Sequence, residues 1–300
     1  MNDLEGSNRE KDASLKEVSS LQIVYQDEVM VIIDKPSGVM THKSRIAEDE
    51  SASAMELLRD QIGRWVYPVH RLDRATSGLL VFGLDKDSAR ALHSAFANGD
   101  VEKKYWAVTR GHGPQAEVID RPLKEKRDRV TDKKADRDKP AQRAKTVITT
   151  LAHCTLPVPL GRYPSARFSL VEARPLTGRR HQLRRHLAGI SYPIIGDTTH
   201  GRGEQNRFFR AHFNSHRLML AAVSIALPHP KTGQRQVFQT PLSGSMSRVC
   251  RSLFQEEAQV NLKLSVGETN RGAVEVGQSA NLTWLSDPNA HRHLFASTHA

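Results

Sequence analysis

A carboxylate flanked by two guanidinium groups is the feature of this sequence that most suggests chemistry. It lies in the stretch HRLDRATSGLL, residues 70–80, where Asp73 follows Arg71 and precedes Arg74. A neighbouring cation favours the ionised form of an aspartate, and a nucleophilic carboxylate must be ionised at neutral pH. A structural ion pair is the commoner role of an aspartate beside an arginine, so the spacing alone leaves both interpretations open.

Motifs for cofactor and metal chemistry are missing from the sequence. It contains no GxxxxGK(S/T) phosphate loop, no GxGxxG, no HExxH and no GxSxG nucleophile elbow. The fourteen histidines are scattered, and His181 and His186 are five residues apart, so on a helix they point in different directions. We therefore expect an activity that needs neither a cofactor nor a metal ion.

The charge distribution predicts a polyanionic partner. The chain of 300 residues carries 44 Lys and Arg against 33 Asp and Glu, a net charge of +11. Residues 1–20 and 256–300 each hold three basic and five acidic side chains, so residues 21–255 alone carry +15. Nucleic acid is the commonest polyanion that such a surface attracts, and the alternative is a basic protein whose charge only keeps it in solution.

Hydropathy and cysteine content exclude other classes of protein. No apolar run approaches the length of about 20 residues that crosses a bilayer, and the first twenty residues lack the apolar stretch of a secretory signal. Cys154 and Cys250 are far apart and form no CxxC pair, which excludes a disulfide scaffold and fits small buried side chains. We expect a cytoplasmic protein that does not enter membranes.

Short apolar runs separated by turn residues predict the elements that must hold Asp73. Strands are expected at 22–25, 29–34, 78–84, 101–110, 145–152, 166–174 and 218–227, and helices at 51–62, 85–97 and 177–187. Asp73 would then lie at a turn before the buried strand 78–84, and Trp106 and Tyr163 would lie in the core. Strands outnumber helices and lack regular βα crossovers, so the predicted class is α+β with a mixed or antiparallel central sheet.

Composition divides the chain into a body and two tails. Residues 1–20 and 256–300 are polar and are expected to be disordered, which leaves 21–255 as one catalytic domain. Within it, residues 121–145 hold eleven Lys or Arg and five Asp or Glu with little apolar periodicity. They form either a solvated loop or an insertion that follows RNA phosphates. The second interpretation is favoured because the segment lies inside the domain.

Residues 70–80 resemble the HRLDxxTSG signature of the RluA-type pseudouridine synthases. Further matches follow in the order of that family. DKPSG at 34–38 resembles its KPxG turn, KKYWA at 103–107 its KxYxA element, TGRRHQLR at 177–184 its TGRxHQ(L/I)R helix, and PIIGD at 193–197 its PI(L/I)GD turn. The resemblance spans residues 21 to about 230 and implies the pseudouridine synthase catalytic fold.

The resemblance also implies a role for each matching residue. Asp73 would be the nucleophile, Tyr105 would stack on the flipped uracil and act as a base near C5, and Arg184 would pair with Asp73. Arg71 would replace the extruded uridine in the RNA helix, with a phosphate contact as the alternative. Phosphate binding is expected from Lys103, Lys104, Arg179, Arg180, Arg185 and the 121–145 insertion.

The expected substrate is a uridine in RNA. The chain is most similar to family members that modify tRNA, and its twenty polar N-terminal residues are too few for the additional S4 domain of many rRNA-modifying relatives. The resemblance thus implies an enzyme that converts a tRNA uridine, number 65 in the T-stem, to pseudouridine without a cofactor. Because no obligate protein partner is evident, we expect a monomer. An rRNA uridine is the alternative substrate. A non-catalytic RNA chaperone on the same fold is the alternative function, but such a binder has no use for a carboxylate beside anionic RNA.

Overall fold

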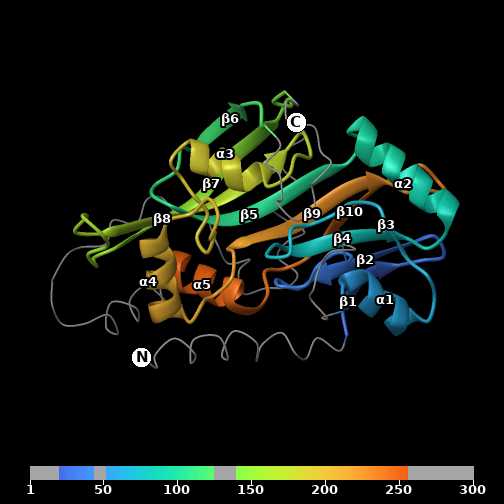
Figure 1. Ribbon diagram of the computed structural model, residues 1–300, viewed down its shortest axis with the longest axis horizontal. Helices are drawn as coiled ribbons and strands as arrows, with labels where there is room; N and C mark the ends of the chain where they lie inside the picture. Colours follow the sequence, from blue (N-terminus) through green and yellow to red (C-terminus); the bar gives the residue numbers. More distant parts are fainter. Residues whose placement is uncertain (1–19, 44–51, 125–139, 256–300) are drawn as a thin grey trace. The chain divides into compact units, whose positions relative to one another are not determined.

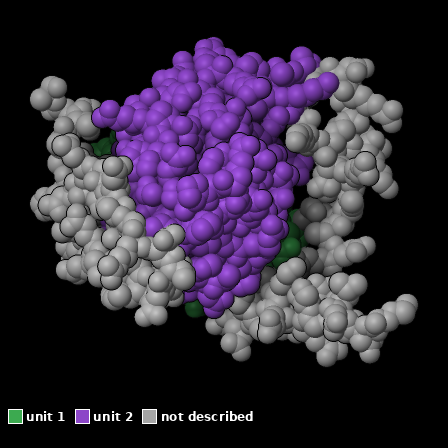
Figure 2. Space-filling model, turned by 90° about the vertical axis from the view of Figure 1, so that its left-hand side faces the viewer, with its two compact units in different colours: residues 1–101, 128–133, 226–238 green, residues 102–127, 134–225, 239–300 purple. Residues whose placement is uncertain are grey.

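The computed structural model describes residues 20–43, 52–124 and 140–255 (Figure 1). These residues belong to two compact units (Figure 2). Within the described ranges, unit 1 comprises residues 20–101 and 226–238, and unit 2 comprises residues 102–225 and 239–255. Apart from Ser20, the tails that the composition predicts lie outside the described residues, as does the middle of the 121–145 insertion.

Unit 1 contains antiparallel strands and two helices. Its strands are β1 (Gln22–Gln26), β2 (Met30–Lys35), β3 (Tyr67–Pro68) and β4 (Ser77–Gly83). β2 pairs with β1 and β4, and β3 also pairs with β4. All residues of β4 are buried, which accounts for its unbroken apolar sequence. The two helices are α1 (Ala54–Ile62) and α2 (Lys86–Asn98).

The helices of unit 1 begin and end where their capping residues place them. Ser53 precedes α1 and forms a capping box with Glu56. Asp85 precedes α2 and accepts hydrogen bonds from two backbone amides of its first turn. Gly99 ends α2 with a φ of 86°, a left-handed conformation that glycine adopts without strain. Both helices therefore lie close to their predicted positions.

The turn between β1 and β2 is organised by Asp27. Its Oδ1 accepts hydrogen bonds from the backbone amides of Val29 (2.9 Å) and Met30 (2.8 Å). Its Oδ2 accepts one from the hydroxyl of Tyr25 (2.8 Å) and lies 2.8 Å from Nε2 of His229. Burial acts to raise the pKa of Asp27, but these hydrogen bonds outweigh it and lower the pKa to about 2.

Unit 2 contains a larger antiparallel arrangement of strands. Its strands, in spatial order, are β5 (Glu102–Arg110), β8 (Ala166–Pro175), β7 (Lys145–Leu156) and β6 (Ala116–Asp120). Its helices are α3 (Gln182–Gly189), α4 (Gly203–Phe213) and α5 (Gly244–Phe254), of which α5 contacts β7. Two further strands, β9 (Leu220–Pro228) and β10 (Arg235–Gln239), pair with each other and contribute residues to both units.

The α+β class and most predicted elements are confirmed. Helix α3, however, begins at Gln182, whereas the sequence pattern predicted 177. β6, β10, α4 and α5 were not predicted. The N-cap residue of α4 is Arg202, so this helix lacks one of the usual start signals, whereas α5 has Ser243 at its N-cap. No helix in the described part of the chain is long and apolar enough to span a membrane.

Of the residues predicted to pack in the core, all but Tyr163 are buried. Trp106, Cys154 and Cys250 are buried, and burial raises the pKa of both thiols to about 12. The core prediction for Tyr163 is wrong. Its ring is half-exposed, because it lies in the tight turn between β7 and β8, where the backbone of Leu160 and Tyr163 pairs across the turn.

Candidate active site

Asp73 lies on the loop that joins β3 to β4 in unit 1. The backbone on either side of it is fixed. Thr41, which is buried, accepts a hydrogen bond from the amide of Leu72 and donates one to its carbonyl, both at 3.2 Å. On the other side, the amide of Thr76 donates to the carbonyl of Asp73 (3.0 Å). Leu72 is buried, and Asp73 is half-exposed on this anchored loop.

A buried lysine also anchors this loop through hydrogen bonds. Lys35 is fully buried, and its ammonium donates hydrogen bonds to the carbonyls of Pro36 (2.9 Å), Val39 (2.7 Å) and Arg74 (3.3 Å). Gly38 and Arg74 exchange two further hydrogen bonds of 2.8 Å, one from each residue. The turn at 36–39 is therefore clamped to the residue that follows Asp73. Lys35 belongs to the KPxG match, but the sequence predicted no role for it.

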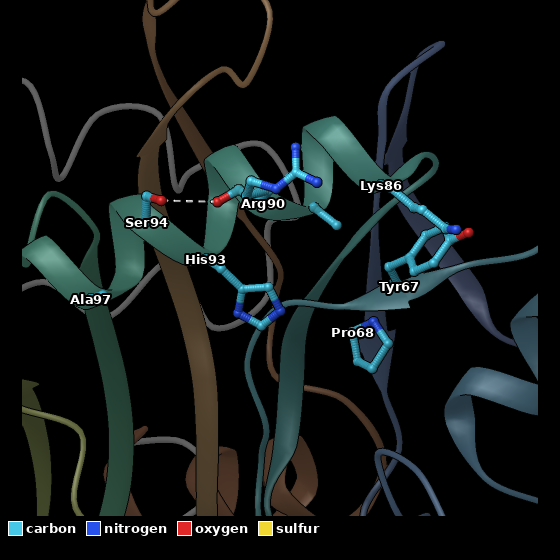
Figure 3. Close-up of a pocket in the computed structure, with 8 residues that line it drawn as sticks. Tyr67, Pro68, Lys86, Arg90, His93, Ser94 and Ala97 are labelled. Carbon is cyan, nitrogen blue, oxygen red and sulfur yellow. Dashed lines mark hydrogen bonds between the residues drawn. The ribbon is translucent and has the colours of Figure 1, made fainter.

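Figure 3 shows a cavity of about 550 Å³ in unit 1, between α2 and β3. It is lined by Tyr67, by the basic side chains Lys86, Arg90 and His93, and by small residues of α2. Ser94 donates to the carbonyl of Arg90 (3.0 Å) along the helix. None of the residues predicted for the site lines this cavity. This cavity therefore does not coincide with the expected chemistry.

In unit 2, the side chain of Gln182 shapes the loop that precedes α3. Its Oε1 accepts hydrogen bonds from the hydroxyl of Thr177 (2.6 Å) and the amide of Arg179 (3.1 Å). Its Nε2 donates to the carbonyl of Lys145 (3.0 Å) and the hydroxyl of Thr146 (2.9 Å). These bonds satisfy the loop outside a helix, which explains why α3 starts later than predicted.

Arg184 projects from α3 into the interior of unit 2, where it pairs with Asp197. Its Nε and Nη2 donate to the two carboxylate oxygens at 2.7 and 2.9 Å. Asp197 also accepts from the amides of Thr199 and His200, both at 2.9 Å. Burial acts to raise the pKa of Asp197, but these hydrogen bonds and the charge of Arg184 hold it below the usual value. Asp197 belongs to the PIIGD match, yet sequence reasoning assigned it no role.

The turn that presents Asp197 depends on its neighbours. Gly196 has a φ of 79°, and a Cβ there would collide with the carbonyl oxygen of Arg217. Asn206 on α4 accepts a hydrogen bond from the amide of Gly196 (2.8 Å) and donates one to the carbonyl of Asp197 (3.0 Å). Helix α4 thus stabilises the turn that holds Asp197, and Asp197 in turn orients Arg184.

The predicted residues fall in both units. Asp73 and the exposed Arg71 lie in unit 1, and the remaining predicted residues lie in unit 2, namely Tyr105, Lys103, Lys104, Arg179, Arg180, Arg184 and Arg185. The pairing of Asp73 with Arg184 therefore stays a prediction. Arg180 lies in the loop before α3, so the expectation that it shares a helix with Arg184 is wrong.

The predicted site residues of unit 2, other than Arg184, differ in burial. Tyr105 and Lys103 are half-buried on β5, and burial lowers the pKa of Lys103. Arg179 and Arg180 are exposed, and Arg179 donates to the carbonyl of Arg143 (3.1 Å), at the base of the insertion. Burial also lowers the pKa of the half-buried Arg185. These positions are compatible with phosphate contacts.

The two ends of the 121–145 insertion pair with each other. Leu123 and Gln142 exchange backbone hydrogen bonds of 2.8 and 3.0 Å, and the amide of Arg121 donates to the carbonyl of Ala144 (3.1 Å). Buried His186 of α3 lies 3.0 Å from the carbonyl of Arg121. Its pKa is lowered, chiefly by burial, which favours the neutral form. The described ends of the insertion are thus an extension of the β6–β7 pair that is tied to α3.

In the described part of the chain, no three His, Cys, Asp or Glu side chains converge as they would around a metal ion. Nδ1 of His181 and Nε2 of His200 lie 3.3 Å apart. A pair of imidazoles without a third ligand falls short of the coordination that structural and catalytic zinc sites use.

Comparison with known proteins links this geometry to one family. The family model for RNA pseudouridylate synthase matches residues 29–189. A tRNA pseudouridine synthase C of Vibrio cholerae serotype O1 is 48% identical over 222 residues, which cover 74% of this chain and 91% of the relative. The protein of the same name from Salmonella typhi is 45% identical over 229 residues, covering 76% and 88%.

Solved structures agree with these sequence matches. Human RNA pseudouridylate synthase domain containing 4 is 26% identical, with a TM-score of 0.59 over 77% of this chain and 92% of its own. Human RNA pseudouridylate synthase domain containing 1 matches the fold with a TM-score of 0.61 and 23% identity, over 85% and 98%. These findings confirm the resemblance that the motifs indicated. The chain belongs to the RNA pseudouridylate synthase family.

Proposed function

We propose that this protein converts a uridine of tRNA to pseudouridine in the cytoplasm, as a monomer and without a cofactor, and that its target is the T-stem uridine numbered 65. The name of the bacterial relatives that are 45–48% identical supports a tRNA substrate. The net charge of +11 supports an anionic partner. The observation that carries the proposal is the anchoring of the Asp73 loop. Its backbone is hydrogen-bonded on both sides of Asp73, and the buried ammonium of Lys35 bonds the carbonyl of the next residue.

In this reaction the carboxylate of Asp73 is the nucleophile, and it attacks either C1′ of the ribose or C6 of the base. The N1–C1′ bond breaks, the uracil turns and C5 bonds to C1′. The proton on C5 is lost and N1 gains one, so the product is an isomer of the substrate. Because no atom or electron is gained or lost overall, the reaction requires no redox partner or co-substrate. A rigid loop lowers the barrier by holding the nucleophile in position before the substrate arrives.

The other predicted residues assist this chemistry. Tyr105 stacks on the flipped uracil and acts as the base at C5, and Arg71 takes the place of the extruded base in the RNA stem. Arg184 pairs with Asp73 and keeps it ionised. Asp197 receives two of the N–H donors of this guanidinium, one from Nε and one from Nη2. Asp197 is thus a positioning residue for Arg184.

The test is a pseudouridine map of total tRNA and rRNA from cells with and without this protein. We expect one T-stem pseudouridine to disappear and to return with the wild-type gene but not with Asp73→Asn. Loss of an rRNA pseudouridine instead would show that the substrate is rRNA. If no pseudouridine is lost from either RNA, the enzyme assignment is contradicted and a role in RNA binding alone is favoured.

A further inference from the structure

Unit 2 contains a cavity of about 260 Å³ to which the reaction assigns no role. It lies between the end of β5, the start of β8, the turn 160–163, the segment after α3 and one residue of α4. Its lining includes neither Tyr105 nor Arg184. Arg110 and Arg167 contribute cations, and no Asp or Glu is among the lining residues. We call this cavity the Gln205 pocket.

The polar group that distinguishes the pocket is the amide of Gln205. Helix α4 buries Gln205 and Asn206 side by side. Asn206 is satisfied by its hydrogen bonds to the backbone of Gly196 and Asp197. Gln205 is only 6% exposed, and among the described residues its Oε1 has no hydrogen-bond partner. A buried acceptor without a partner costs free energy, so its presence in a cavity points to a ligand that supplies an N–H or O–H donor.

The walls of the pocket are planar groups. Tyr163 accepts a hydrogen bond from Nη2 of Arg162 (3.0 Å), and the guanidinium groups of Arg162 and Arg110 lie 5.2 and 5.7 Å from its ring centre. The ring of Tyr192 lies against Gly111, where a Cβ would approach it to 3.3 Å. Aromatic rings and guanidinium planes are the surfaces on which proteins stack unpaired RNA bases.

The floor of the pocket is apolar and rigid. Phe168 is fully buried and packs edge-on against Phe209 of α4, with ring centres 5.0 Å apart. The volume falls just below the range of about 300–1,000 Å³ typical of sites for drug-sized ligands. A pocket of this size has room for one planar heterocycle. Arginines at its rim provide the charge that a nucleotide phosphate would contact.

We propose that the Gln205 pocket receives a nucleobase of the substrate RNA other than the uridine that reacts. The inference rests on the proposed function, because that function supplies the RNA substrate whose base would bind here. Gln205 would accept a hydrogen bond from an N–H group on the edge of that base. Tyr163 and Arg110, which both line the pocket, would stack on its face. An unpaired or extruded base in this position would fix the register of the RNA and so select among uridines of similar local sequence.

The test is a double-mutant cycle between protein and RNA, measured by filter binding at fixed salt. The wild type, Gln205→Met and Tyr163→Ala are titrated with an unmodified tRNA transcript and with versions that each lack one base. Gln115→Met, a change of an exposed glutamine in unit 2, is the matched control. Thermal unfolding checks that each variant is folded, and Tyr163→Ala alters only a half-exposed side chain should Gln205→Met fail to fold.

We expect Gln205→Met and Tyr163→Ala each to weaken binding about tenfold, and Gln115→Met to have no effect. One base-free transcript should weaken binding by wild type to the same extent but cause no further loss with either variant. If every base deletion is additive with both variants, or if neither variant weakens binding, the pocket does not hold a base. Pseudouridine formation by the wild type on the same transcript is measured separately. Its absence would contradict the proposed function and leave the binding cycle interpretable.

Discussion

Arg184 and Asp197 form a two-pronged ion pair across a turn of unit 2, with N–O distances of 2.7 and 2.9 Å. The side chain of Asp197 is completely buried and that of Arg184 is 8% exposed. Both carboxylate oxygens have donors, and Asp197 receives two backbone amides as well. The guanidinium is therefore held in one orientation by the carboxylate of Asp197.

Removal of the charge of Asp197 should destabilise the protein. Asp197→Asn removes the carboxylate charge that faces the buried guanidinium of Arg184, and we expect a loss of about 3 kcal/mol in the free energy of unfolding. The control is Asp120→Asn, because the ion pair of Asp120 with Lys145 is longer, at 3.5 Å, and more exposed. That variant should lose less than about 1 kcal/mol. Urea unfolding measures both, and equal losses would show that the buried pair contributes no more than a surface pair.

Arg184 and its neighbour Arg185 should affect different steps. If Arg184 sustains the ionised form of Asp73, Arg184→Met lowers the single-turnover rate by orders of magnitude at nearly unchanged RNA affinity. Arg185→Met should instead weaken binding and reduce the slope of log K against log salt by about one unit at most. Filter binding at several salt concentrations beside single-turnover rates separates the two effects. An Arg184→Met protein that lost only affinity would place Arg184 among the phosphate contacts.

Asp73→Asn should abolish product formation while RNA binding is largely retained. The substitution preserves the shape of the side chain and removes the nucleophilic oxygen charge, whereas phosphate contacts supply most of the affinity. Release of tritium from C5-labelled uridine in a tRNA transcript measures the reaction. Turnover by this variant above the background of a protein-free control is the result that would refute Asp73 as the nucleophile.

Lys35→Met should reduce both stability and activity. The ammonium of Lys35 bonds three carbonyls in a buried position, so its loss leaves acceptors without donors next to the Asp73 loop. We expect a decrease of about 2 kcal/mol in the free energy of unfolding and a reduction in rate of roughly tenfold, measured well below the melting temperature. Lys86→Met, an exposed lysine beside the cavity in Figure 3, is the control. An unchanged rate in Lys35→Met would show that the loop does not depend on the clamp.

The turn of Asp27 should make unit 1 sensitive to acid. The pKa of Asp27 is about 2 in the folded protein, below the value of 3.8 for an unperturbed aspartate. Its contribution is therefore complete above pH 4 and is lost as the pH falls towards 2, and it amounts to about 2 kcal/mol. Asp27→Asn should show a smaller fall in stability across this range than the wild type in urea unfolding at successive pH values. Parallel curves would contradict the assignment.

Local signals explain which elements could be predicted. Helix α2 was predicted closely because Asp85 and Gly99 mark its ends in the sequence, and β4 because residues 78–83 carry no polar side chain. Helix α4 escaped prediction because it buries Gln205 and Asn206, polar residues that a periodicity of apolar side chains does not register. Their burial depends on a turn and a cavity formed by distant segments.

The candidate site shows the same division. Asp73, Tyr105 and Arg184 were found through motifs, whereas the partner of Arg184 in unit 2 was not. Asp197 lies thirteen residues away in the sequence, and only the turn at Gly196 brings the two together. Lys35 was overlooked for a related reason. A lysine in a sequence suggests an exposed charge, and its three carbonyl partners become apparent only when the chain has folded.

The backbone pairing of Leu123 with Gln142 brings the ends of the basic insertion to the separation of neighbouring strands, about 5 Å. The backbone pairing in unit 2 therefore holds the two ends of the insertion together without needing any contact from the residues between them. The entropy of closing a loop grows only with the logarithm of its length, by about 0.6 kcal/mol for each doubling. The length of the chain between residues 123 and 142 can thus change at little cost to the scaffold.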